Sequence, residues 1–210
     1  MRKLSALLGA MLLVAQAGAA EDPVQTAIHQ LEDIRNDPQR YQQSYEAGRE
    51  RVHFCGYCHG ETGNSRRDHV PNLAGQNAAY LFRQFEKFRS GERTDYVMTQ
   101  LAKSLTLDER VNIALFYAAQ TVEPRPAVDP KLQAAGLALF QQVCFSCHGR
   151  QGEGVESMPR LAGQPESYVR QALIRFRKDD PSRANSPMVG IAASLSDEEI
   201  AAVAAYVQTM

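Results

Sequence analysis

The chain has 210 residues, of which 44% are hydrophobic and 22% are charged, and its formal net charge is −1. These fractions suit a soluble globular protein of one or two domains and argue against a disordered chain. The near-neutral charge argues against nucleic-acid binding through a basic face. Four cysteines are too few to build a disulfide scaffold, so their placement carries the information.

Residues 1–20 have the order of a secretory signal peptide. Arg2 and Lys3 precede an apolar run at residues 4–15, and small residues then lead to Glu21. The run is shorter than the roughly 20 residues of a membrane-spanning helix. We therefore expect export across the cytoplasmic membrane with cleavage, which leaves a net charge of −3. Cleavage could follow any of three small residues, Ala17, Ala19 and Ala20.

The rest of the chain contains one unit twice. The segment C-G-Y-C-H-G from Cys55 recurs as C-F-S-C-H-G from Cys144, 89 positions later. The segment P-N-L-A-G-Q from Pro71 recurs as P-R-L-A-G-Q from Pro159. Further pairs keep the same order: Tyr80 with Tyr168, Met98 with Met188, and Tyr117 with Tyr206. The order and the nearly constant offset indicate a tandem duplication of a small domain.

The repeats and the composition between them define the expected organisation. Three prolines between the copies predict a stiff, extended linker. The expected parts are a signal peptide at 1–20, an acidic helical extension at 21–44, a first domain at 45–122, a linker at 123–130 and a second domain at 131–210.

Each unit is expected to be all-α. Apolar residues from Leu81 to Phe88 fall at helical spacing, and Gly91 follows as a stop. Convincing strand alternation is absent from the sequence. A domain this small buries little core unaided, so a large apolar cofactor would help to hold it together. Helix-start signals stand at Thr106 with Glu109, Ser196 with Glu199, and Asp129 with Pro130.

The motif C-x-x-C-H, present in both units, is the attachment signature of c-type haem. Two thiols three positions apart can form thioethers with the two vinyl groups of one porphyrin, and the adjacent histidine then faces the iron. A zinc site would need further cysteines, and a redox-active pair would not need the histidine. Two disulfides are a further alternative. The predicted residues are Cys55, Cys58, Cys144 and Cys147 for attachment of two haems, with His59 and His148 as proximal iron ligands.

Met98 and Met188 are the candidates for the sixth iron ligand, because they correspond between the copies. Filling the core is the alternative role of a methionine. His69 and Met158 could compete as ligands, but neither has a counterpart in the other copy. The remaining histidines, His29 and His53, are expected to face solvent or to pack.

Other matched residues could support the haems. Pro71 and Pro159 offer free carbonyls that could accept from the proximal histidines, or could simply shape a turn. Guanidinium groups suit haem propionates, and the candidates are Arg66, Arg67 and Arg160. Tyr80 and Tyr168 could also reach a propionate, or pack on the ring edge.

The ordered double set of motifs resembles the dihaem cytochrome c4 family over about residues 45–210. The resemblance implies two tandem class I cytochrome c domains packed face to face, each around a covalently attached haem. It implies His59 with Met98 and His148 with Met188 as axial pairs. It also implies electron transfer in the periplasm from a quinol-oxidising complex to a terminal oxidase of a respiratory chain, with loose association with the membrane face.

Residues 21–44 depart from that family pattern. They carry five acidic residues against two arginines, a net charge of −3. Such a segment could cover or create a docking surface, so it leaves the partner open.

Three functions remain from the sequence. The first is an electron carrier, in which both irons are six-coordinate and no substrate binds at the metal. The second is the cytochrome subunit of a dehydrogenase complex, such as a flavoprotein that oxidises sulfide. The third is an enzyme acting at one haem, which would need an open or unusually ligated iron. We expect the carrier, and not an enzyme.

Overall fold

The computed structural model describes residues 22–127, 129–155, 158–183 and 186–210. Over these ranges the chain is helical and contains no strand. The α-helices are α1 (Pro23–Asn36), α2 (Pro38–Arg51), α3 (Gly56–His59), α4 (Ala78–Ser90), α5 (Tyr96–Ser104), α6 (Leu107–Ala118), α7 (Pro130–Leu139), α8 (Phe145–His148), α9 (Glu166–Arg177), α10 (Met188–Ala193) and α11 (Asp197–Val207). Short 3₁₀ turns occupy Val52–Phe54 and Pro181–Arg183, and a π-helical turn occupies Phe140–Cys144.

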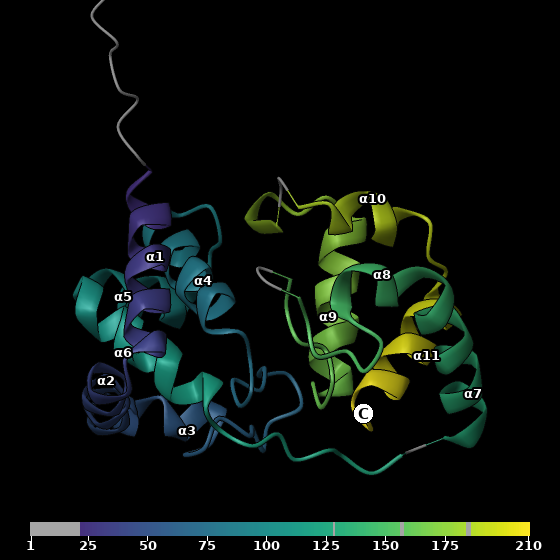
Figure 1. Ribbon diagram of the computed structural model, residues 1–210. Coiled ribbons are helices and arrows are strands. Elements are labelled where there is room, and N and C mark those ends of the chain that lie inside the picture. Colours follow the sequence, from purple (N-terminus) through teal and green to yellow (C-terminus); the bar gives the residue numbers. More distant parts are fainter. Residues whose placement is uncertain (1–21, 128, 156–157, 184–185) are drawn as a thin grey trace, which may run out of the picture.

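The helices form two bundles that lie side by side (Figure 1). The first contains α1 to α6 and the second contains α7 to α11, and each has its own apolar core. In both, the first helix of the repeat packs on the last, α2 on α6 and α7 on α11. The sequence repeat is therefore a repeat of structure, and the all-α expectation is confirmed.

A glycine lies at each of these helix crossings. A Cβ on Gly48 would overlap the backbone carbonyl of Asn112, and a Cβ on Gly136 would overlap that of Ala202. The two glycines are 88 positions apart, the same offset as the twin P-x-L-A-G-Q segments. Because neither glycine has a side chain, the paired backbones approach more closely than any other residue would permit.

The predicted helix ends are present. Thr106 and Ser196 each form a complete capping box with the glutamate three residues later. Asp129 accepts from the backbone N–H of Lys131, with Pro130 in the first turn of α7. These local signals specify where each helix begins independently of the haem.

Helix α1 is an addition to the first bundle and has no counterpart in the described part of the second. It buries four apolar residues against α2, α4 and α6: Ala27, Ile28, Leu31 and Ile34. The next helix, α2, begins at Pro38, so the boundary expected at residue 45 falls inside a helix. Asp37 caps α2 as Asp129 caps α7. We therefore propose Pro38 as the start of the first domain.

The linker contacts both bundles through one arginine. The backbone N–H of Arg125 donates to the carbonyl of Gln208, 2.8 Å away, in the second bundle. Its guanidinium pairs with the Asp68 carboxylate at 2.6 Å and donates to the Ser65 carbonyl in the first. Residues 121–127 are free of helix and run extended beneath the two bundles (Figure 1). Among the described residues, no helix is long and apolar enough to span a membrane.

We predict that Gly136→Ala destabilises the second bundle, because the new methyl group overlaps the Ala202 carbonyl. Overpacking of this kind costs about 1–3 kcal/mol. Gly190→Ala is the matched control, since a Cβ there meets no atom within 4 Å. It should be neutral or stabilising by up to about 1 kcal/mol, because alanine favours a helix. Thermal unfolding of the haem-loaded proteins measures both changes, and equal midpoints would contradict the close crossing.

Candidate haem sites

Each C-x-x-C-H motif forms one short turn of helix. In the first, the His59 N–H donates to the Cys55 carbonyl at 2.9 Å, so these residues and Cys58 lie along one side of the turn. Gly60 ends the turn with φ of 79°. Gly149 ends the second turn, α8, with φ of 80°. Both values lie in the region that favours glycine, which explains why glycine follows both motifs.

None of the four cysteines forms a disulfide. Burial raises the pKa of Cys55 and raises that of Cys144 to about 11. A redox-active pair needs a lowered thiol pKa, so these environments do not favour thiol–disulfide chemistry. No cluster of three or more metal-ligating side chains exists within the described ranges, so the zinc alternative has no support there.

Both histidines are buried and both donate to a proline carbonyl. The atoms His59 Nδ1 and Pro71 O are 2.9 Å apart, and His148 Nδ1 and Pro159 O are 2.8 Å apart. Burial lowers the pKa of both imidazoles, although the hydrogen bond to proline opposes that shift. Each ring is therefore neutral, with its proton on Nδ1 and Nε2 left to bind iron.

The two methionines are half-buried, and each packs on the apolar core of its own bundle. Met98 lies in α5 and packs against the same apolar core as Cys55. Met188 opens α10 and packs against the same core as Cys144. The cap residue Asp95 accepts from the backbone N–H of Met98 at 2.9 Å, which fixes the start of that turn. Each bundle thus supplies a thiol and a thioether to one apolar surface.

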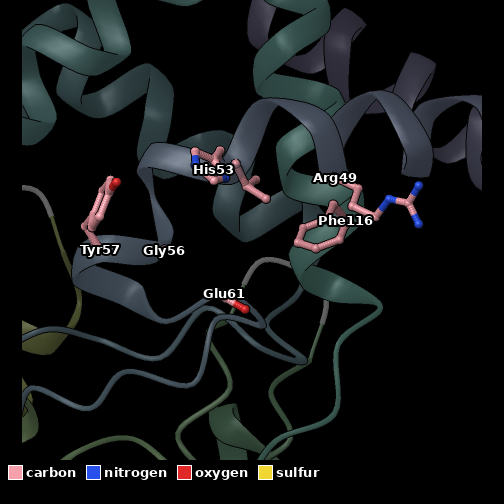
Figure 2. A pocket seen from close by; sticks show the side chains of 7 residues that line it. Arg49, His53, Gly56, Tyr57, Glu61 and Phe116 are labelled. Carbon is pink, nitrogen blue, oxygen red and sulfur yellow. The ribbon is translucent and has the colours of Figure 1, made fainter.

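The alternative ligand candidates differ in burial, and Met158 is half-buried. His69 and His29 are exposed. His53 is exposed on the 3₁₀ turn before Cys55, and its ring lies edge-on to Phe54 and Tyr57. Figure 2 shows His53 at a surface hollow of about 370 Å³ whose lining includes none of the predicted ligands.

The arginines expected near propionates do not gather at one place. Arg66 and Arg67 are exposed, and Arg67 Nη1 lies 3.7 Å from Cys58 Sγ. Arg160 is half-buried, and burial lowers the pKa of its guanidinium.

Two other arginines meet between the bundles. Arg93 donates to the Tyr168 hydroxyl at 3.4 Å, across the interface, and the charge of Arg183 also acts on that phenol. Among the described residues neither guanidinium forms an ion pair with a carboxylate. Burial raises the pKa of Tyr80. Burial also raises that of Tyr168, but the two arginines outweigh it and bring the pKa to about 8. This is a cationic site suited to carboxylates.

A sequence signal for these arginines existed. Arg93 and Arg183 are 90 positions apart, which is the offset of Met98 and Met188. The pairing is visible once the repeat is extended upstream of each methionine, but neither residue belongs to a longer matching segment.

The residues present fit haem c: paired free thiols, a neutral histidine with a free Nε2, and a methionine at a shared apolar surface, twice over. The site geometry and the fold thus define a tandem c-type cytochrome. The cytochrome c family model matches residues 133–210.

Comparison with known proteins narrows the family to which the chain is similar. It is 36% identical to cytochrome c4 of Pseudomonas aeruginosa over 174 residues, which covers 77% of this chain and 86% of the relative. The crystal structure of reduced recombinant cytochrome c4 from Pseudomonas stutzeri matches with a TM-score of 0.73 at 32% identity, covering 79% of this chain and 97% of that one. A thiosulfate dehydrogenase electron acceptor of Stutzerimonas stutzeri is 33% identical over 72% of this chain and 76% of its own length.

The chain belongs to the cytochrome c4 family. It is an electron-transfer protein with two covalently bound haem c groups and is not itself an enzyme. The expected fold of two tandem cytochrome c domains is confirmed.

We predict that Cys144→Ala impairs haem loading of the second domain only, because one of its two thioether bonds is lost. The haem content should fall from two per chain toward one, measured by pyridine haemochrome absorbance and protein mass. Ser146→Ala, at an exposed position within the same motif, should retain two haems. Unchanged haem content in Cys144→Ala would contradict covalent attachment through this motif.

Proposed function

We propose that this chain carries electrons in the periplasm from a quinol-oxidising complex to a terminal oxidase. The observation that supports this most is that each bundle holds a neutral, buried histidine and a half-buried methionine, the two residue types that would ligate one haem iron. An iron held on both sides by protein exchanges electrons without binding a substrate. The contact between the bundles keeps the two carriers in one fixed unit.

The proposed axial pairs are His59 with Met98 and His148 with Met188. When bound, each haem supplies one-electron redox chemistry. The proline carbonyls orient the histidine rings and make them better electron donors. The Asp95 cap fixes the first turn of α5 and with it the position of Met98. The four motif cysteines attach the haems.

We also propose that Arg93 and Arg183 bind haem propionates at the interface. Their lack of carboxylate partners within the described ranges, and their shared contact with Tyr168, support this role. A positive site there would stabilise the anionic propionates and shield them from one another. Arg66 and Arg67 are too exposed to be comparable candidates.

Export to the periplasm rests on the signal-peptide pattern of residues 1–20, which lie outside the described residues. The expected loose association with the membrane face is part of the same proposal, since a quinol oxidiser and an oxidase both reside in the membrane.

A second candidate function is acceptance of electrons from a soluble dehydrogenase. The relative named as the electron acceptor of thiosulfate dehydrogenase covers most of this chain and favours it. A flavoprotein sulfide dehydrogenase would make a similar demand. Both candidates need the same closed haems and differ only in the donor.

We predict that Met98→Ala opens one iron, so that half of the reduced haem binds carbon monoxide and one reduction potential falls. The fall follows because a thioether ligand favours ferrous iron. The unaltered protein should show no carbon monoxide shift. Met158→Ala removes the methionine that has no counterpart and should behave as the unaltered protein does. A Met98→Ala titration that matches the original would overturn the assignment.

The donor is tested by mixing the oxidised protein with two reducing systems in a stopped-flow spectrometer. One is a purified cytochrome bc1 complex with decylubiquinol, and the other is thiosulfate dehydrogenase with thiosulfate. We expect haem reduction at least tenfold faster with the first. Faster reduction by the second system would replace the quinol-oxidising complex with a dehydrogenase as the donor.

A further inference from the structure

The twin P-x-L-A-G-Q segments meet across the interface, and the glutamine of each pairs with the backbone of the other. Asn72 N donates to Gln164 Oε1 at 3.1 Å, and Gln164 Nε2 donates to the Asn72 carbonyl at 2.8 Å. In the corresponding contact of the other repeat, Arg160 N donates to Gln76 Oε1 at 2.7 Å, and Gln76 Nε2 donates to the Arg160 carbonyl at 2.9 Å. Gln76 is 4% exposed and Gln164 is 5% exposed, so water does not compete for these bonds.

One peptide group joins this interface to each proximal histidine. The peptide between Pro71 and Asn72 accepts from His59 Nδ1 through its carbonyl and donates to Gln164 through its N–H. In the second bundle, the Pro159 carbonyl accepts from His148, and the N–H of the same peptide donates to Gln76. Each histidine is thus two hydrogen bonds from a glutamine of the opposite domain.

Hydrogen bonds in such a chain polarise one another. A peptide whose N–H donates carries more negative charge on its carbonyl, and is therefore a better acceptor. The effect is larger in a buried site, where the effective dielectric is low. A stronger acceptor at Nδ1 makes the imidazole more basic and stabilises ferric iron bound at Nε2. The direction of the effect is a lower reduction potential for that haem.

We propose that Gln164 and Gln76 are positioning residues that set the potential of the haem in the opposite domain. Gln164 acts on the haem of His59, and Gln76 acts on the haem of His148. The proposal rests on the proposed ligation of iron by these histidines. It assigns to the interface a role beyond holding the domains together: each domain tunes the other through one peptide group.

The test is Gln164→Leu in the full haem-loaded protein. Leucine keeps the approximate volume and removes both hydrogen bonds to Asn72, which are the ones that the Gln164 side chain forms with the described residues. The potential of the first haem should rise, with the second shifting by less than a third as much. Gln76→Leu should shift the other redox step upward. Because the two variants should raise the potentials of different redox steps, the test does not require knowing beforehand which step belongs to which haem.

A purely structural role predicts a different result. Loosening the interface admits water, which stabilises the more highly charged ferric state and lowers both potentials together. Asn77→Ala is the matched control, because Asn77 Nδ2 donates across the interface to the Met158 carbonyl at 2.7 Å and touches neither histidine-accepting peptide. It should leave the difference between the potentials unchanged.

A second readout reports the hydrogen bond itself. In ¹⁵N-histidine-labelled, fully reduced protein, which is diamagnetic, the Nδ1–H proton of His59 should move upfield in Gln164→Leu. Gln164→Glu keeps an acceptor for Asn72 N–H and adds charge, so the same proton should move downfield. The His148 proton should hold its position in both variants. The Cys144→Ala protein, with its second haem lost, identifies the His59 resonance.

The outcomes separate the inference from the proposed function. An unshifted His59 Nδ1–H proton in Gln164→Leu would overturn the proposed effect of Gln164 on the first haem. Two potentials that fall together in that variant would do the same. Either result would leave histidine–methionine ligation intact. Failure of that ligation would show in the unaltered protein, as carbon monoxide binding or a high-spin spectrum. If Gln164→Leu does not fold, the shift of the His59 Nδ1–H proton in Gln164→Glu still tests the proposal. An upfield shift, or no shift, in that variant would overturn it.

Discussion

One hydrogen bond from Nδ1 to a proline carbonyl holds each of the proposed proximal histidines, and the arrangement of each candidate haem site depends on that contact. The bond fixes the tautomer, so that Nε2 remains for iron, and burial keeps the ring neutral. A neutral buried histidine without this acceptor would leave an unsatisfied donor in an apolar core. Proline suits the position because it offers a carbonyl and has no N–H of its own that needs a partner.

Both repeats keep this hydrogen bond, and the glutamines of the interface connect its two copies. Gly48 and Gly136 let the terminal helices of each repeat cross closely. The P-x-L-A-G-Q segments serve each domain internally and also form the interface, which explains why they match more fully than the helices around them. Two further differences between the domains lie outside these segments. Helix α1 is found on the first domain, and the Arg125 linker ties the first domain to the end of the second.

The sequence predicted most of what is local. Capping boxes and the motif turns involve residues within five positions of one another, so they can be predicted from the sequence without knowledge of the fold. The start of α2 is hard to predict because its fully buried residues are Ser44 and Gly48, two small residues that give a weak apolar pattern. The Arg93–Arg183 site was missed because it exists only when two domains meet, and one isolated matching arginine resembles any surface arginine. Met98 and Met188 could be proposed as ligands because they lie in matched segments.

The interface glutamines explain how the duplicated domains could diverge and still remain joined. Position 72 is asparagine and position 160 is arginine, which share neither size nor charge. At those two positions the glutamines bind the backbone N–H and carbonyl, which every residue other than proline provides. The side chains there were therefore free to change: Asn72 now also donates to the Gly163 carbonyl at 2.6 Å, while Arg160 lies half-buried nearby. A contact that recognises backbone keeps the link to each histidine constant while the two surfaces around it become different.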